Sequence, residues 1–359
     1  MGPMTARPTT KSAATAPARH MRAMDIVRAG DKGFLEMAER TIAPPAKGEV
    51  QIRVAYSGVN RADLYQVAGS YAPPEGVTSI PGMEVAGTIE ALGEGVVGWS
   101  AGEEVCALIS GGGYAEYVNA PASQVLSLPR AVDLKESASL PEACATAFMA
   151  LSIEAGLRPG ERVLLHGGAS GVGIIMAQVA RAWGAEVFAT AGGQEKCDVL
   201  AHHGIRAIDH RAAPFAQQVE AATHGEGVDV IIDTLGAKHL AEHFALLKRG
   251  GRLVSLAFLD GNVVESLKIA PILTRSLSWS GTTLRGKSAA QKAEIVEGVK
   301  KSIWPYLATG LIRPLIDRVF PLEAAEKAHL RMEERLHIGK ILLEVHEITN
   351  SRGNESTNS

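Results

Sequence analysis

Cysteine is scarce in this sequence and is not arranged in pairs. It occurs three times in 359 residues, at Cys106, Cys144 and Cys197, with no CxxC or other close spacing. This arrangement excludes a disulfide framework and a zinc site built from thiolates. It also favours a reducing compartment, so we expect a cytoplasmic protein.

The sequence also lacks a strong net charge and a long hydrophobic run. Its formal charge is −3 at pH 7, which supplies no field to attract nucleic acid or an anionic membrane surface. No apolar run reaches the roughly 18 residues of a membrane span. We therefore expect neither nucleic acid nor a membrane among the partners of this protein.

Glycine is the residue that the sequence has in excess. Its 38 copies exceed the average share of roughly 7%, so many backbone positions are expected to need a positive φ or a close approach. The hydrophobic share of 46% and the charged share of 21% are ordinary for a globular chain, which excludes the disordered and collagen-like classes. The length predicts about two domains.

Both ends of the chain have the composition of tails. Residues 1–21 contain no acidic residue and are rich in Ala, Thr and Pro, and such a segment cannot bury a core. Residues 347–359 are polar apart from Ile348 and Gly353. We expect disorder at both ends. A basic, acid-free start is also typical of organelle transit peptides, and that alternative stays open for the first segment.

The folded body changes its hydrophobic period near the middle. Val50, Ile52, Val54 and Tyr56 alternate with polar or small residues, which predicts an antiparallel, barrel-like sheet in the first part. From about residue 157, strands alternate with helices, which predicts an α/β fold with a doubly wound parallel sheet. Helices are predicted over 174–183, 195–203, 239–247 and 289–301, and strands over 162–166, 186–190, 228–233, 252–256 and 340–345.

A glycine-rich turn carries the strongest chemical signal. The segment 168–173, Gly-Ala-Ser-Gly-Val-Gly, follows a predicted strand and opens a helix. Backbone N–H groups and the positive end of a helix are suited to hold a pyrophosphate. A tight packing turn between strand and helix is the alternative. We predict that the turn binds a dinucleotide through Ala169, Ser170, Gly171, Val172 and Gly173.

The tip of the next strand indicates which dinucleotide binds. A protein that binds NAD places a carboxylate there for the ribose 2′-OH, whereas residues 190–196 read Thr-Ala-Gly-Gly-Gln-Glu-Lys, with no carboxylate at the tip. Gly192 makes room for a 2′-phosphate, and Lys196 with His210 or Arg211 can pair with that group. We therefore predict NADPH as the cofactor. Lys196 is alternatively a solvated residue in the first turn of a helix.

Several motifs together resemble the quinone oxidoreductase branch of the medium-chain dehydrogenase/reductase superfamily. They are Gly58-Val-Asn-Arg-Ala-Asp63, Gly82-Met-Glu-Val-Ala-Gly87, Pro141-Glu-Ala, His166-Gly-Gly-Ala-Ser-Gly-Val-Gly173 and His337-Ile-Gly-Lys-Ile341. Within that branch, residues 61–74, 190–196 and 283–285 are most similar to the tumour-suppressor-induced NADPH:quinone oxidoreductase group and its bacterial relatives.

The resemblance implies a domain organisation and an assembly. A GroES-like, mostly antiparallel β catalytic domain is expected from residues 22–137 and 282–346. A Rossmann domain that binds NADPH is expected from residues 138–281. The stretch 276–283 has the pattern of an edge strand, and the resemblance implies that it joins the Rossmann sheets of two subunits in a homodimer.

Two positions depart from the zinc-dependent alcohol dehydrogenases of the same superfamily. Those enzymes hold a catalytic metal with a Cys and a His at the positions where this sequence has Asn60 and Met83. A neutral amide and a thioether cannot build a zinc site, so we predict no metal. Glu84, with no metal to support, is expected to make a structural hydrogen bond within the turn.

The remaining site residues are predicted around the nicotinamide. Asn60 and Tyr71 are expected to contact the acceptor or the nicotinamide amide. Asp63 either orients them or pairs with Arg61 or a backbone donor. Phe258 and Leu259 are predicted near the cofactor, because they follow a strand of the parallel sheet at its carboxyl end. Arg285 is expected to reach either the cofactor or a carboxylate at the domain junction.

The predicted reaction is hydride transfer from NADPH to a quinone without a metal. Quinones and α,β-unsaturated carbonyls are electrophilic enough for positioning and modest polarisation to suffice. An enoyl or alkenal reductase that acts on a conjugated C=C bond stays open as an alternative. A non-catalytic nucleotide-binding protein is the alternative of another class.

Overall fold

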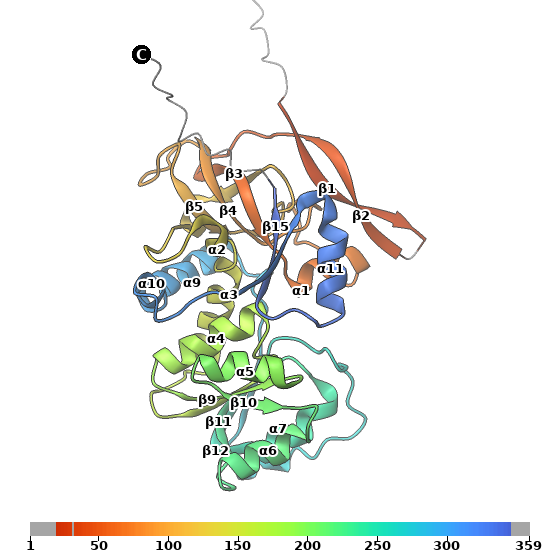
Figure 1. Cartoon of the computed structure of the whole chain (residues 1–359), viewed down its shortest axis with the longest axis vertical. Helices are drawn as coiled ribbons and strands as arrows, with labels where there is room; N and C mark the ends of the chain where they lie inside the picture. The colour runs from red at the N-terminus through yellow and green to blue at the C-terminus, as the bar shows by residue number, and fades with distance from the viewer. Residues whose placement is uncertain (1–18, 31, 346–359) are drawn as a thin grey trace, which may run out of the picture.

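The computed structural model describes residues 19–30 and 32–345 (Figure 1). The predicted tails over 1–18 and 347–359 lie outside the described residues. The expectation that residues 20 and 21 belong to a tail was wrong, because β1 (His20–Ala29) begins at His20 and pairs with β2 (Lys32–Thr41). Met21 packs against the core, so this apolar side chain gains from joining the strand.

The first sheet is the predicted, mostly antiparallel one. It has seven strands in the order β14-β15-β3-β4-β5-β7, with β6 also pairing with β3. Only β14 and β15 pair in parallel. The four residues of the predicted alternation in β3 are all buried. The bounds are β3 Glu49–Gly58, β4 Glu84–Leu92, β5 Glu104–Leu108, β6 Tyr117–Pro121, β7 Val125–Ser127, β14 Ile316–Pro321 and β15 Lys340–Glu344.

The second sheet is the predicted doubly wound parallel one. Its six strands run in the order β10-β9-β8-β11-β12-β13, and every pair is parallel. This is the strand order of a dinucleotide-binding fold, in which the order reverses between β8 and β11. The bounds are β8 Arg162–Leu165, β9 Glu186–Ala191, β10 Arg206–Asp209, β11 Val228–Asp233, β12 Leu247–Ser255 and β13 Ser278–Gly281.

Helices connect the two sheets. In Figure 1, α3 (Pro141–Phe148) lies between the antiparallel sheet and α4 (Gly171–Ala182), and residues of α3, α4 and the parallel strands form one apolar core. The remaining α-helices are α1 Arg61–Ala68, α2 Leu134–Ser137, α5 Gln194–His202, α6 Phe215–Ala222, α7 Leu240–Leu246, α8 Ala270–Thr274, α9 Ala289–Ser302, α10 Trp304–Ala308 and α11 Ala325–Glu333. Short 3₁₀ or π turns occur at Ala122–Gln124, Met149–Glu154, Ala237–His239 and Leu322–Ala324.

Two elements differ in extent from their predictions. Helix α4 begins at Gly171 rather than Ile174, because the side chain of Ser170 caps it and allows the glycine-rich turn to become its first turn. The predicted edge strand over 276–283 is confirmed in its place but shortened to Ser278–Gly281. In the described part of the chain, no helix combines the length and the apolar character that crossing a bilayer requires.

Candidate active site

The glycine-rich turn has the geometry of a phosphate-binding helix start. Ser170 Oγ accepts a hydrogen bond from Gly173 N at 3.0 Å. Helix geometry leaves the N–H groups of Gly171 and Val172 without an acceptor inside the helix. A Cβ at Gly173 would lie 2.2 Å from Gly167 O, and one at Gly171 would lie 2.6 Å from Lys340 Cδ. A side chain at Gly173 would collide with the backbone, so this position requires glycine, whereas one at Gly171 would displace the Lys340 side chain. Two N–H groups remain for a ligand.

Basic side chains gather beside the tip of β9. A Cβ at Gly192 would lie 3.0 Å from both Arg211 Nε and His210 Nε2. Lys196 Nζ donates to Arg335 O at 2.6 Å. Burial, followed by the charge of Arg211, lowers the pKa of Lys196. The structure thus brings the predicted phosphate-binding residues together.

A carboxylate does stand near this tip, on the neighbouring strand. Asp209 Oδ1 accepts hydrogen bonds from Gly193 N at 3.0 Å and Arg211 N at 2.9 Å. These two backbone bonds lower its pKa. Asp209 is thereby engaged in holding the loop that carries the basic side chains.

Asn60 is held by two buried ions of opposite charge. Its Oδ1 accepts a hydrogen bond from Lys340 Nζ at 2.6 Å, and its Nδ2 donates to Glu84 Oε1 at 3.0 Å. Lys340 and Glu84 also form an ion pair with each other, with side chains 4% and 0% exposed. Glu84 Oε2 accepts from the backbone N–H of Glu142 at 2.9 Å. The predicted role of Glu84 within its own turn was therefore too narrow, because its carboxylate joins β4, β15 and α3.

The carboxylate of Asp63 lies at the start of α1, among backbone donors. Its carboxylate accepts hydrogen bonds from Asn60 N at 2.8 Å, from Gly82 N at 3.0 Å and from the Tyr114 hydroxyl at 3.3 Å. Arg61 instead donates to Met332 O at 2.9 Å, so of the two alternative partners the structure shows the backbone donors. Burial raises the pKa of Asp63 to about 6, and the two backbone N–H groups oppose the shift. Asp63 is fully buried, and it fixes the start of α1 and with it Asn60.

Arg285 and Tyr71 lie against each other on the side of the antiparallel sheet. The guanidinium carbon of Arg285 lies 5.6 Å from the centre of the Tyr71 ring. Arg285 Nε donates to Ser110 O at 2.7 Å, and Lys292 Nζ donates to Ser110 Oγ at 2.5 Å. The structure therefore places Arg285 beside Tyr71, and its hydrogen bond goes to Ser110 rather than to the glycine-rich turn.

Phe258 and Leu259 follow β12 at its carboxyl end, as predicted. Leu259 N donates to Thr234 O at 3.0 Å, which fixes the loop against the end of β11. The Phe258 side chain is 52% exposed. Both residues therefore lie at the sheet edge where parallel α/β folds bind their ligands.

Glu142 and Lys340 were absent from the predicted site residues. Desolvation, followed by the negative charge of Glu84, raises the pKa of Glu142 to about 7. The Thr146 hydroxyl donates to its Oε1 at 3.3 Å. Both residues lie inside motifs that carried the family resemblance, Pro141-Glu-Ala and His337-Ile-Gly-Lys-Ile341, and those motifs were the available signal.

The donor set around Asn60 does not fit a zinc ion. Within residues 19–30 and 32–345, no group of three or more His, Cys, Asp or Glu side chains is suited to hold a metal. Met83 is buried beside the Glu84 strand, and the Lys340 ammonium already bonds to Asn60 and Glu84. A divalent cation at the same donors would be repelled by that ammonium.

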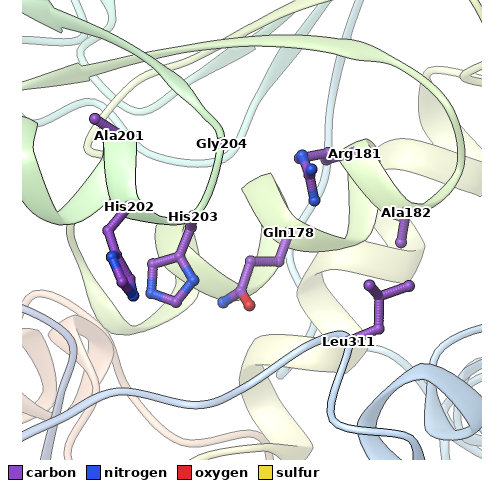
Figure 2. A pocket seen from close by; sticks show the side chains of 8 residues that line it. All are labelled: Gln178, Arg181, Ala182, Ala201, His202, His203, Gly204 and Leu311. Atoms are coloured by element: carbon purple, nitrogen blue, oxygen red, sulfur yellow. The ribbon is translucent and has the colours of Figure 1, made fainter.

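A hollow of about 310 Å³ lies apart from these residues, between α4, α5 and Leu311 (Figure 2). Gln178 projects into it, but its amide oxygen accepts from Arg313 N at 3.0 Å and its amide nitrogen donates to Arg313 O at 2.9 Å. His202 and His203 come from the other wall. None of the predicted site residues lines this hollow, and we assign it no role.

Comparison with known proteins identifies families for both parts of the chain. The chain matches the alcohol dehydrogenase GroES-like domain over residues 46–130 and the zinc-binding dehydrogenase family over residues 171–298. Quinone oxidoreductase of Sus scrofa is 31% identical over 331 residues, which cover 90% of this chain and 97% of that protein.

Two solved structures illustrate the range of similar proteins. Escherichia coli quinone oxidoreductase complexed with NADPH has a TM-score of 0.79 at 27% identity, over 90% of this chain and 100% of that one. CurK enoyl reductase has a TM-score of 0.79 at 28% identity, over 90% and 99% of the two chains.

Proposed function

The chain belongs to the medium-chain dehydrogenase/reductase superfamily, and on that premise we propose that it is an NADPH-dependent quinone reductase that works without a metal. The observation that carries the proposal is the hydrogen-bonded set of Lys340, Asn60 and Glu84. Because an ammonium stands among the donors that a Lewis acid would need, the acceptor must be reducible by positioning and polarisation alone. Quinones meet this requirement.

The basic group beside β9 supports NADPH as the cofactor. His210 and Arg211 bring positive charge against the backbone of Gly192, and Lys196 lies within the electrostatic reach of Arg211; this group of cations suits a 2′-phosphate. The N–H groups of Gly171 and Val172 suit the pyrophosphate. Similarity to the NADPH complex of the Escherichia coli enzyme points the same way.

The proposed mechanism assigns roles to the residues of this chain. When bound, NADPH supplies the hydride. Lys340 and Glu84 hold the amide of Asn60 in one orientation, and Asp63 fixes the helix start that carries it. Glu142 has a pKa near neutrality, so its carboxyl can hold the proton that the reduced acceptor needs.

Oxidation of NADPH in the presence of para- and ortho-quinones tests the proposal directly. We expect a quinone-dependent loss of the reduced nicotinamide absorbance, faster than with NADH. A purified protein that binds NADPH but reduces no member of the panel contradicts the proposed activity.

Similarity to CurK enoyl reductase favours a second candidate, the reduction of a conjugated C=C bond. The same site would deliver hydride to the β carbon and stabilise the enolate oxygen. Mass analysis after incubation with an enone or an enoyl thioester separates the two candidates, because only a saturated product supports this one.

Arg211→Ala is expected to weaken NADPH binding by about tenfold or more, because a hydrogen bond to a charged group contributes about 1.5–3 kcal/mol. Binding of NADH, which lacks the 2′-phosphate, should not change. Fluorescence titration with both cofactors measures this. Arg206→Ala is the matched control, since Arg206 lies at the opposite end of β10 and pairs with Glu186. An equal loss for NADPH and NADH in Arg211→Ala contradicts the assignment.

We further propose a cytoplasmic homodimer formed through β13. This strand pairs with β12 along one side and ends the sheet, and open edges of this kind tend to be paired or covered. Trp279, at 44% exposure, lies on this strand. Sedimentation at micromolar concentration should give a dimer, and a monomer throughout contradicts the proposal.

A further inference from the structure

Arg285 presents two unpartnered N–H groups inside the protein. The residue is 4% exposed. Its Nε donates to Ser110 O at 2.7 Å, but Nη1 and Nη2 are both buried without a hydrogen-bond partner in the described part of the chain. Buried polar groups are nearly always satisfied, and leaving a charged one unsatisfied is costly. A guanidinium held this way indicates that a ligand completes it.

The surroundings of Arg285 add positive charge without neutralising it. Lys292 is 3% exposed and donates through Nζ to Ser110 Oγ at 2.5 Å and to Arg285 O at 2.8 Å. Among the described residues, neither cation forms a salt bridge within 4.0 Å. Asp63 and Glu142 act on Arg285 only through space. Two buried cations without an ion-paired carboxylate are suited to receive negative charge from outside the chain.

The contacts of Arg285 separate it from the cofactor loop. Ser110 follows β5 and Tyr71 follows α1, so both belong to the part of the chain that carries Asn60 and Asp63. The glycine-rich turn and the basic group beside β9 belong to the parallel sheet. Arg285 thus stands on the side of the site that is expected to hold the acceptor.

Resting on the proposed function, we propose that Arg285 binds a negatively charged oxygen of the electron acceptor and takes no part in holding NADPH. The free edge with Nη1 and Nη2 matches an oxygen pair or a single anionic oxygen. The Tyr71 ring, which lies against the guanidinium, provides a flat apolar surface for the acceptor.

The negative oxygen has two sources. In the first, the acceptor gains the hydride and its electron pair, the charge rests on a former carbonyl oxygen, and a proton from solvent or from Glu142 then yields the hydroquinone while NADPH becomes NADP⁺. In the second, the acceptor carries a separate carboxylate that stays ionised throughout. Arg285 remains protonated in both cases.

The test compares wild type with Arg285→Met and Arg285→Lys on a carboxylated para-quinone and its methyl ester. Removal of one charged donor at a developing oxyanion costs about 100-fold in rate, so Arg285→Met should lose about that factor in kcat/KM, with Arg285→Lys in between. Fluorescence titration should show an unchanged Kd for NADPH. An equal fall in kcat for acid and ester identifies the reacting oxygen, and a rise in KM for the acid alone identifies a separate carboxylate.

Arg318→Met is the matched control. The guanidinium carbon of Arg318 also lies over an aromatic ring, 5.9 Å from the centre of Phe320, but Arg318 is exposed to solvent. Arg285→Met with weakened NADPH binding and unaltered acceptor kinetics overturns the proposal. If wild type binds NADPH but reduces neither quinone, the proposed function fails on its own. In that case, calorimetric titration of benzoate into the NADPH complexes of wild type and Arg285→Met tests the anion site by itself. Binding to wild type that is lost in Arg285→Met supports the proposal. Equal binding to both proteins, or no binding to wild type, contradicts it.

Discussion

Lys340→Met is expected to destabilise the protein by about 3–5 kcal/mol, the usual cost of leaving one partner of a buried ion pair without the other. The Glu84 carboxylate would remain 0% exposed. It would keep only the N–H donors of Asn60 and Glu142. Urea unfolding followed by fluorescence measures the loss.

The same substitution should abolish activity beyond its effect on folding. Lys340 fixes Asn60 from one side, and its neighbour Gly339 donates to Ala169 O at 2.8 Å, in the glycine-rich turn. The segment of Gly339 and Lys340 therefore connects the glycine-rich turn to Asn60. Loss of Lys340 should lower kcat even under conditions where the variant is folded.

Two further variants make this prediction falsifiable. Lys301→Met removes an exposed lysine that pairs with Glu297 four residues earlier in α9, and such surface pairs contribute only about 0.3–0.5 kcal/mol. Lys340→Met combined with Glu84→Gln removes both buried charges and should recover part of the stability. A loss in Lys340→Met no larger than that in Lys301→Met would show that the buried pair is unimportant.

Stability should fall as the pH is lowered from 6.5 toward 4, because several histidines are buried in neutral form. His166 Nε2 and His243 Nε2 lie 2.9 Å apart, and His166 Nδ1 faces the Thr190 hydroxyl at 3.2 Å. His243 Nδ1 is buried and has no hydrogen-bond partner among the residues that the structure describes. Burial lowers the pKa of His243 to about 4 and that of His166 well below its usual range.

The sign of the effect follows from proton uptake. The folded-state pKa values of these histidines lie below the unfolded value of 6.5, so the unfolded state binds more protons between the two. Their contribution is complete above pH 6.5 and is lost as the pH falls toward 4. His329 and His337, also with pKa values lowered to about 4 by burial, act in the same direction.

Three acids among the described residues oppose this trend. Burial raises the pKa of Asp63 to about 6, that of Glu142 to about 7 and that of Asp233 above its usual value, so the folded state takes up their protons first and gains stability as the pH falls through their folded-state pKa values. Burial also lowers the pKa of His203 and of His210, so six histidines with lowered pKa values outnumber the three acids, and we expect net destabilisation.

His243→Leu isolates the histidine contribution. The substitution removes one group that takes up a proton when the protein unfolds. It should therefore reduce the slope of the unfolding free energy against pH by about 1.4 kcal/mol per pH unit. Denaturant unfolding at a series of pH values between 4 and 7 measures the slope. His202→Leu, on the exposed side of α5, is the control. An unchanged slope in His243→Leu would contradict the role of the buried pair.

The fold was predictable because its signals are local. The alternation in β3, the strand–turn–helix around the glycine-rich turn and the edge strand near residue 279 each occupy a short stretch of chain. Hydrophobic period and turn chemistry act over such distances. The predicted alternation of strands and helices is confirmed as the order of the parallel sheet.

The site was less predictable because its contacts are distant in sequence. Lys340 and Asn60 are 280 residues apart, and Arg285 and Ser110 are 175 apart. No local pattern distinguishes a lysine that will be buried beside Glu84 from one on the surface. The motifs marked the region of Glu142 and Lys340 but did not indicate their partners.

The sequence by itself therefore determined the two sheets and the place of the glycine-rich turn at the start of a helix, since each depends on residue type and short-range spacing. Only the tertiary structure decided that Asn60 is held between Lys340 and Glu84 and that Asp63 fixes the start of α1. It also decided that Arg285 faces Tyr71 while its Nη1 and Nη2 groups find no partner within the described part of the chain. The physical reason is that burial and charge pairing are properties of packed segments, and these segments meet only when both sheets have formed.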